Sequence, residues 1–300
     1  MSKKSLLVIA SLAYDRIEAQ GNKIDKTLGG AGTYICLSIK HFNINSSIIS
    51  VVGYDFKNED LQLLKSCGFD ISGIKIVKDD KTFFWSCFYT EGFKERITTK
   101  TELNVMENFN PIIPTSKLNS DIILLGNLHP SIQLSTINQL NNNPKTIILD
   151  TMNFWIDNFR EIVLEVISKV NIISINDEES EMITGQKDLT KAAKALNSMG
   201  PDYVIIKKGE YGAELFSNNK RYVSKAFKVK KVIDPTGAGD CFIAGIVGFL
   251  SNLNEVSFES IKQAINYGTS IASFNVEDMG TKNLLNLSKH DIESRVKKIN

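Results

Sequence analysis

A turn of small residues, 234–240, reads Asp-Pro-Thr-Gly-Ala-Gly-Asp and leads directly into an apolar run at 241–250. The start of a helix leaves backbone N–H groups unpaired at the positive end of the helix dipole, and glycines there let a phosphate approach the main chain. Asp240 falls in the first turn. A carboxylate beside an anion weakens anion binding, so the pattern indicates a second task, such as accepting a proton from a nucleophilic hydroxyl. An ordinary acidic first turn behind a Thr or Gly N-cap would have the same residues.

Two further clusters have residues suited to a small ligand. Segment 28–34, Leu-Gly-Gly-Ala-Gly-Thr-Tyr, precedes an amphipathic helix, and its glycines permit positive φ and close backbone approach. It lacks the spacing of a G-x-G-x-x-G fingerprint directly after a strand, which disfavours a Rossmann dehydrogenase. Asp15 follows the first predicted strand within five residues, where strand ends present ligand-binding groups, so it could bind paired hydroxyls. A plain turn aspartate is the alternative.

Two more clusters follow predicted strands. In Asn176-Asp177-Glu178-Glu179 the asparagine is a natural N-cap and the acids are natural first-turn residues, while the same oxygens could position Mg²⁺ through bound waters. Segment 207–212, Lys-Lys-Gly-Glu-Tyr-Gly, ends a strand with two glycines that would let the backbone approach a nucleotide. A hairpin turn would have the same composition.

These groups need a scaffold, and the chain alternates short apolar runs with amphipathic stretches. Buried strands are predicted at 6–10, 121–125, 146–150, 170–175 and 203–206. Helices are predicted at 131–141, 159–169, 178–184, 189–199, 257–274 and 288–299. This succession predicts a largely parallel sheet covered by helices.

The region 82–105 differs, because it reads as antiparallel strands around a Gly-containing turn. Together with polar residues near 13–27 it predicts a small sheet that closes over a ligand as a lid. An edge extension or a dimer contact would explain the same pattern. Its aromatic residues Phe84, Trp85 and Phe88 suit either stacking on a ligand or packing within the small sheet.

Composition excludes several classes of protein. The 300 residues have a formal net charge of +1 with scattered lysines, which gives no footprint for nucleic acid. No apolar run reaches 18 residues, and the first is too short for a signal peptide, so neither a membrane span nor secretion is predicted. The four cysteines, Cys36, Cys67, Cys87 and Cys241, have no C-x-x-C spacing, so neither a zinc site nor a disulfide framework is implied and a reducing cytoplasm fits. A hydrolase is disfavoured because no G-x-S-x-G elbow occurs and His41, His129 and His290 lack recognisable partners.

Taken in order, these motifs resemble the ribokinase-like sugar kinases, also called the phosphofructokinase-B family, over essentially the whole chain. Segment 234–240 matches the specific D-T/P-T-G-A-G-D signature, Asn176 and Glu179 meet the N-x-x-E pattern, and Gly29-Gly30 fall at the early diglycine. The resemblance implies an α/β fold: a ribokinase-like three-layer sandwich with a mostly parallel central sheet flanked by helices, plus a small β-sheet lid. It implies one domain over 1–300, with the lid formed approximately by 13–27 and 82–105.

Carried over position by position, the resemblance implies an ATP- and Mg²⁺-dependent kinase that phosphorylates a hydroxyl of a small sugar or sugar-containing substrate. Asp240 would be the catalytic base. The other roles it implies are a backbone anion hole at Gly237, Ala238 and Gly239; substrate contacts at Asp15, Gly29, Gly30 and Tyr34; nucleotide contacts at Lys208, Gly209, Gly212, Thr236 and Gly239; and Mg²⁺ and phosphate organisation by Asn176 and by Glu179 through water. Relatives also suggest K⁺ near Asp234 and 274–281, and a homodimer through the lid.

One departure concerns the acceptor. Family members that phosphorylate simple sugars commonly have Asn at the position of Tyr34. A phenol is longer, donates one proton and can stack on an apolar group, so a nucleoside or an aromatic-substituted riboside joins pentoses and hexoses as a candidate. Two other classes stay open: a non-catalytic nucleotide-binding sensor, and a hydroxymethylpyrimidine or pyridoxal kinase, which usually lacks a full lid.

Overall fold

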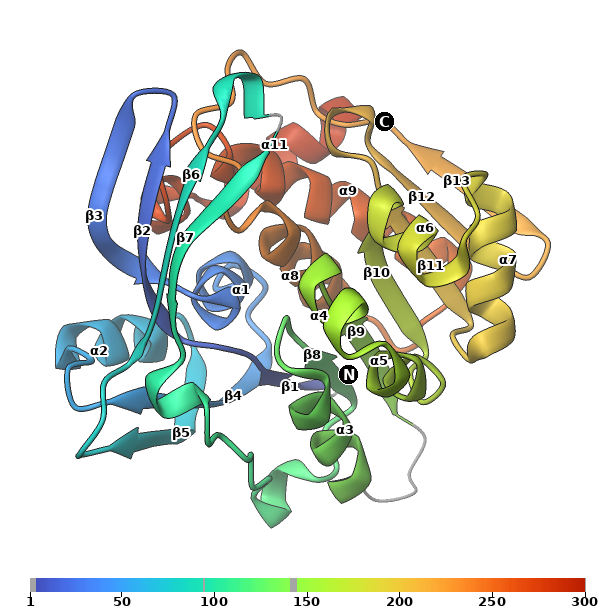
Figure 1. Cartoon of the computed structure of the whole chain (residues 1–300). Helices are drawn as coiled ribbons and strands as arrows, with labels where there is room; N and C mark the ends of the chain where they lie inside the picture. The colour runs from blue at the N-terminus through green and yellow to red at the C-terminus, as the bar shows by residue number, and fades with distance from the viewer. Residues whose placement is uncertain (1–3, 94, 141–144, 300) are drawn as a thin grey trace.

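The computed structural model describes residues 4–93, 95–140 and 145–299. Within them, a nine-stranded sheet has the strand order β13-β12-β11-β10-β9-β8-β1-β4-β5 (Figure 1). Its strands are β1 (Ser5–Ile9), β4 (Asn45–Gly53), β5 (Phe69–Val77), β8 (Ile122–Leu125), β9 (Thr146–Asp150), β10 (Ile172–Asn176), β11 (Tyr203–Lys207), β12 (Ala213–Ser217) and β13 (Lys220–Ser224). All neighbours pair in parallel except β11–β12 and β12–β13. The five strands predicted from apolar runs are confirmed within a few residues.

Helices cover both faces of this sheet. They are α1 (Ala31–Ile39), α2 (Asn58–Ser66), α3 (Pro130–Gln139), α4 (Asn153–Asn158), α5 (Arg160–Ile167), α6 (Asp177–Thr184), α7 (Leu189–Met199), α8 (Ala238–Leu250), α9 (Phe258–Asn275), α10 (Lys282–Asn286) and α11 (Lys289–Ile299). The six predicted helices correspond to α3, α5, α6, α7, α9 and α11; position 141 of the first prediction lies outside the described residues.

Alternation along the strands divides the interior into two cores. In β1, Leu6 and Val8 pack with α1, α8 and α9 on one face, while Leu7 and Ile9 pack with α3, α5 and α7 on the other. Successive strand residues point to opposite faces, so a strand apolar at every position must be covered on both sides. The predicted three-layer α/β sandwich is therefore confirmed.

A second sheet, the lid sheet, has the order β3-β2-β6-β7. It is formed by β2 (Ala13–Ala19), β3 (Asn22–Gly29), β6 (Phe83–Tyr89) and β7 (Arg96–Glu102), and in Figure 1 it stands at the left edge of the main sheet. The predicted antiparallel pairing within 82–105 is confirmed in β6 and β7, whereas β2 and β6 pair in parallel. Position 94 lies outside the described residues. The division of the chain into one domain and a lid subdomain stays a prediction.

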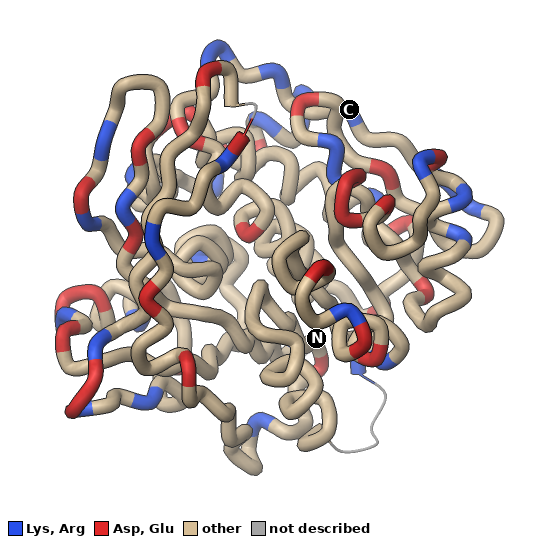
Figure 2. The backbone as a smooth tube through the Cα atoms, in the orientation of Figure 1, with Lys and Arg blue, Asp and Glu red and all other residues tan. Residues whose placement is uncertain are grey.

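Charge and cysteine positions agree with a globular protein with a mixed surface. Figure 2 shows basic and acidic residues interspersed along the visible chain. All four cysteines are buried as free thiols. Among the helices that the structure describes, none is both long and apolar enough to cross a membrane. The lid-mediated homodimer and the cytoplasmic location remain predictions.

Candidate active site

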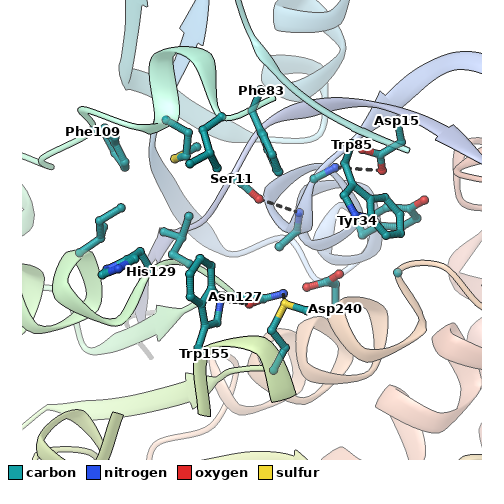
Figure 3. Close-up of a pocket in the computed structure, with 18 of the residues that line it drawn as sticks. Ser11, Asp15, Tyr34, Phe83, Trp85, Phe109, Asn127, His129, Trp155 and Asp240 are labelled. Carbon is teal, nitrogen blue, oxygen red and sulfur yellow. Dashed lines mark hydrogen bonds between the residues drawn. The ribbon is translucent and has the colours of Figure 1, made fainter. Parts of the chain in front are cut away.

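A cavity of about 340 Å³ opens between the lid sheet, the carboxyl ends of the parallel strands and the start of α8. Figure 3 shows its two ends. Asp15, Tyr34 and Asp240 gather at one end, where the small-residue turn also lies. Phe109, His129 and Trp155 line the other end. The structure thus brings together the two predicted carboxylates, Asp15 and Asp240, that are distant in sequence.

The turn at 234–240 depends on a backbone conformation that favours glycine. Gly237 is the N-cap of α8, with φ +75° in the left-handed region. A Cβ at this position would lie 2.3 Å from Cδ1 of Tyr34, because the Tyr34 ring packs directly on the turn. Any larger residue would both strain the backbone and displace the ring.

Three side chains, one from the turn itself, one from α9 and one from β6, hold this turn in place. Asp234 accepts hydrogen bonds from the backbone N–H of Thr236 at 2.9 Å and of Gly280 at 2.8 Å. Asn275 in α9 donates to the Thr236 carbonyl at 2.7 Å. The hydroxyls of Thr236 and Tyr89, the last residue of β6, lie 2.9 Å apart. The turn is therefore fixed before any ligand binds, which favours electrostatic stabilisation of a developing charge.

At the start of α8, one backbone N–H group already donates a hydrogen bond and others have no acceptor within the described residues. The N–H of Ala238 donates to the Pro235 carbonyl at 3.2 Å. Within the described chain, the N–H groups of Gly237, Gly239 and Asp240 have no protein acceptor. An anion hole at this turn would consequently rely on Gly237 and Gly239, with the amide of Ala238 already engaged. The role of all three residues stays a prediction.

Asp240 sits at the third position of α8 with its carboxylate facing the cavity. Burial, followed by the charge of Asp150, raises its pKa to about 8, with a smaller contribution from Asp15; Lys207 and Arg96 oppose the rise. A carboxylate that takes up a proton near neutral pH has the property required of a general base. The alternative, an acidic first turn behind a Gly N-cap, describes the same local structure, so the role of Asp240 as the base stays a prediction.

Asp15 lies within β2 of the lid sheet rather than in a loop after β1. Its carboxylate covers the backbone of the diglycine: a Cβ on Gly29 would lie 2.0 Å from Oδ2, and the N–H of Gly30 donates to Oδ2 at 3.4 Å. Gly30 has φ +80°, and a Cβ there would approach the Ser11 carbonyl to 2.6 Å. Burial raises the pKa of Asp15 to about 7. The diglycine therefore lets a buried carboxyl reach the cavity.

Tyr34 is 2% exposed, and its hydroxyl has no hydrogen-bond partner among the described residues. Burial raises the pKa of this phenol well above its ordinary value, with Asp15 and Asp234 adding to the effect. A buried hydroxyl without a partner is costly unless a ligand supplies one. Its position beside Asp15 suits the predicted substrate contact.

Asn176 and Glu179 form a reciprocal capping box at the start of α6. The N–H of Glu179 donates to Asn176 Oδ1 at 2.7 Å, and the N–H of Asn176 donates to Glu179 Oε2 at 2.8 Å. The predicted N-cap is confirmed. Burial raises the pKa of Glu179 to about 7, although Lys207 opposes the rise. One carboxylate oxygen of Glu179 thus remains for a ligand, and its predicted metal role stays a prediction.

The segment 207–212 is a hairpin between β11 and β12. Lys208 donates to Glu214 at 2.8 Å, and Glu214 also binds Arg221, so the Lys208 ammonium is engaged within the hairpin. Gly212 has φ +90°, and a Cβ there would lie 2.0 Å from the Ser224 carbonyl. The hairpin alternative explains these residues, and nucleotide contacts by Lys208, Gly209 and Gly212 stay predictions.

Several residues in or beside the site were not predicted. Asp150 and Lys207 end β9 and β11, and form a partly buried ion pair with 3.0 Å between Asp150 Oδ1 and Lys207 Nζ. Asn127 accepts a hydrogen bond from Trp155 Nε1 at 2.8 Å, and both line the cavity with His129. Asp150 and Lys207 could have been found by the signal that found Asn176, since each is a polar residue that ends a buried strand.

The described residues contain no group of three or more His, Cys, Asp or Glu side chains arranged as a metal cage. Mg²⁺ nevertheless suits such a site, because it keeps several waters and is held by one or two carboxylates together with substrate phosphates. Glu179 offers one buried carboxylate for this purpose. Near the turn, Asn275 Oδ1 is buried without a partner among the described residues, and the predicted K⁺ site in this region stays a prediction.

Comparison with known proteins gives a consistent result. The family description "pfkB family carbohydrate kinase" matches residues 3–287. A cytidine kinase of Thermococcus kodakarensis is 27% identical over 247 residues, covering 81% of this chain and 87% of that protein. A nucleoside kinase of Methanocaldococcus jannaschii is 28% identical, and the match covers 85% of this chain and 81% of that protein. A crystal structure of the nucleoside kinase from this organism superposes with a TM-score of 0.79 at 24% identity, covering 99% of this chain and 100% of that chain. A putative ribokinase II from E. coli gives a TM-score of 0.84 at 17% identity, covering 99% of this chain and 100% of its own.

Proposed function

Because the chain belongs to the pfkB family of carbohydrate kinases, phosphotransferases with hydroxyl acceptors, we propose that it transfers the γ-phosphate of ATP to a sugar hydroxyl of a nucleoside-type acceptor. The observation that carries the proposal is the two-ended cavity. Asp15, Tyr34 and Asp240 provide hydroxyl ligands and a base at one end, and Phe109 and Trp155 provide apolar aromatic surface at the other. A sugar bearing a planar base matches both ends, since bases stack readily on aromatic side chains.

Charge in the cavity argues for a neutral acceptor. Asp15 and Asp240 line the acceptor end, and Arg96 is the cationic side chain among the described cavity residues. The pKa of His129 is lowered by burial, so its ring is neutral near pH 7. Above about pH 8, where both carboxyl groups are ionised, a sugar phosphate would meet two negative charges here, which disfavours phosphorylated acceptors.

The mechanism follows from the turn. Asp240 accepts the proton of the acceptor hydroxyl as the new O–P bond forms, the bond to the leaving oxygen of ADP breaks, and the N–H groups of Gly237 and Gly239 bind the phosphoryl oxygens. Asp15 orients the sugar. The lid sheet excludes water, which would otherwise compete as acceptor. Mg²⁺, held by Glu179 with Asn176 beside it, would supply charge neutralisation for the phosphates; K⁺ would bind near Asp234 and Asn275 and support the turn.

The raised pKa of Asp240 predicts the pH dependence. A base must be ionised to act, so kcat/KM should fall about tenfold per pH unit below an apparent pKa near 8 and level off above it. The measurement is initial ADP release at subsaturating acceptor between pH 5.5 and pH 9.5. A rate independent of pH across this range would remove Asp240 from the role of base.

The acceptor is tested by an ATP-depletion screen over nucleosides, pentoses, hexoses and ketose phosphates. We expect a nucleoside to give a kcat/KM at least about 100-fold above that of free ribose, because the ribose leaves the aromatic end unfilled. Asp240→Asn serves as the blank. A ketose phosphate or a simple hexose as the best substrate would refute the nucleoside assignment but leave the kinase assignment intact. Absence of product with every alcohol, despite ATP binding, would favour the nucleotide-binding sensor.

Trp155 provides a separate test of the aromatic end. Trp155→Leu should lower kcat/KM for the nucleoside about tenfold and leave that for ribose within about twofold, because only a stacked base contacts the indole. Phe154→Leu is the matched control, since Phe154 is the adjacent aromatic, is half-exposed and does not line the cavity. Equal losses for both acceptors in Trp155→Leu would mean that the indole supports the fold rather than the base.

A further inference from the structure

The end of β11 presents a lysine that the motifs did not identify as functional. Lys207 is the last residue of β11 and is registered beside Asn176 of the neighbouring strand β10. Its side chain is 18% exposed, and its Nζ donates to Asp150 Oδ1 at 3.0 Å. Strands β9, β10 and β11 are parallel neighbours in the sheet (Figure 1). Asp150, Asn176 and Lys207 are the last residues of these strands, so all three lie at the carboxyl end of the sheet.

The ammonium also adjoins the turn at the start of α8. A Cβ added to Gly239 would lie 3.4 Å from Lys207 Nζ, so the absence of a side chain at position 239 leaves the space between them open. The N–H of Gly239 has no protein acceptor in the described chain. Lys207 Nζ and the N–H of Gly239 are therefore donors of neighbouring residues, and both have hydrogen-bonding capacity left for a ligand.

An ammonium group has three N–H donors. Among the described residues, Lys207 Nζ has one hydrogen-bond acceptor, Asp150. Burial would lower the pKa of Lys207, but Asp150 and Glu179 outweigh it and raise the pKa, so the group remains charged. A fixed, charged donor with unused N–H groups suits an anion with several oxygens.

Lys208 gives the contrast within the same dipeptide. Its ammonium binds Glu214 on β12, so it is committed to the hairpin. A purely structural role for Lys207 would leave unexplained why its partly buried ammonium adjoins Gly239, whose N–H also lacks an acceptor in the described chain, since an ion pair shielded from water contributes little net stability.

We propose that Lys207 is a catalytic residue that binds the transferring phosphoryl group through Nζ, with Asp150 as the positioning residue that aims the ammonium. The inference rests on the proposed kinase function and adds the cation that the anion hole otherwise lacks. The γ-phosphate gains negative charge on its outer oxygens as it leaves ADP, and a nearby cation stabilises that charge.

The test compares Lys207→Met with the wild-type protein by isothermal titration calorimetry. The probes are the Mg²⁺ complexes of ADP and of an ATP analogue with a methylene bridge between the β- and γ-phosphates. We expect Lys207→Met to bind the ATP analogue about 30-fold more weakly and ADP less than about threefold more weakly, because only the former has the contacted group. With the acceptor that the screen identifies, kcat should fall about 100-fold. Lys194→Met, an exposed lysine of α7, should leave both affinities and kcat unchanged.

Loss of Lys207 leaves Asp150 buried without its partner, so the double variant Lys207→Met/Asp150→Asn, which removes both charges, is measured alongside. If Lys207 binds the phosphoryl group, the double variant keeps the selective loss for the ATP analogue. If it recovers wild-type preference for the analogue over ADP, the pair is structural and the inference is wrong. A wild-type protein that binds neither nucleotide overturns the kinase proposal together with the inference, whereas equal analogue binding by wild type and Lys207→Met overturns the inference alone.

Discussion

Asp240→Asn should lower kcat by at least 100-fold, and by about 10³-fold if proton acceptance limits the rate. The amide has nearly the shape of the carboxylate but cannot accept the proton of the acceptor hydroxyl. The measurement is ADP release at saturating ATP and nucleoside, with ADP affinity measured by calorimetry to show that the nucleotide site is intact. Asp157→Asn, an exposed acid in α4, serves as the control and should keep wild-type turnover. Undiminished turnover in Asp240→Asn would exclude Asp240 as the base.

The same variant should be more stable than the wild-type protein. The folded pKa of Asp240 is raised from 3.8 to about 8, so the folded state holds this proton more tightly than the unfolded state. The resulting stabilisation is fully present below about pH 4 and is lost progressively as pH rises from there to about 8, where the carboxylate of the folded protein ionises. The amide of the variant would not ionise, so the melting temperature of Asp240→Asn should exceed that of the wild-type protein by several degrees at pH 9 and by much less at pH 5. Both expected results have one cause, since the surroundings that raise the pKa of Asp240 also destabilise the folded protein when its carboxylate is ionised.

Gly237→Ala should damage both activity and stability. The new Cβ would lie 2.3 Å from the Tyr34 ring, and φ +75° is unfavourable for alanine. We expect kcat to fall at least 100-fold, because the turn that presents the amide groups must move, and the free energy of unfolding to fall by about 2–4 kcal/mol. Kinetics and urea denaturation measure the two effects.

Gly68→Ala separates backbone strain from steric overlap. Gly68 has φ +88°, but nothing lies within 4 Å of the place that a Cβ would take there, so only strain of about 1 kcal/mol is expected and kcat should not change. In a Tyr34→Ala background, Gly237→Ala should cost no more than Gly68→Ala, because the overlapping ring is gone. If Gly237→Ala costs the same with and without Tyr34, the ring does not restrict the turn.

The main sheet could be predicted where a continuous apolar run fills the middle of a strand, as in β8, β9 and β11. Strand β4 was not predicted, since Ser46, Ser47 and Ser50 interrupt its apolar pattern although all three are buried. Strand β12 contains the buried Glu214, whose charge is balanced by Lys208 and Arg221 from flanking segments. Polar residues inside strands are tolerated when distant partners satisfy them, and local periodicity does not contain that information.

The residues of the candidate site also fall into two groups, those that sequence could identify and those that it could not. Asp240, Gly237 and Asn176 belong to short motifs whose spacing specifies a local structure, so sequence could identify them. Asp150 ends a predicted strand and Lys207 and Asn127 each follow one, which marks each as a candidate, but which of them lie together depends on strand order in the sheet. His129 was interpreted as lacking partners, yet it lines the cavity with its ring packed edge-on against Trp155 and Phe159. Tertiary proximity of this kind has no signal in one sequence.

The hydroxyl pair formed by Tyr89 and Thr236, 2.9 Å apart, joins the last residue of a lid strand to the turn at 234–240. A movement of β6 that breaks this contact also releases one of the three anchors of the turn. Acceptor and nucleotide affinities must then be thermodynamically linked, each ligand strengthening the other by the same factor when both prefer the joined arrangement. Tyr89→Phe, which removes the phenolic hydroxyl, should therefore make the affinity for the acceptor independent of bound nucleotide.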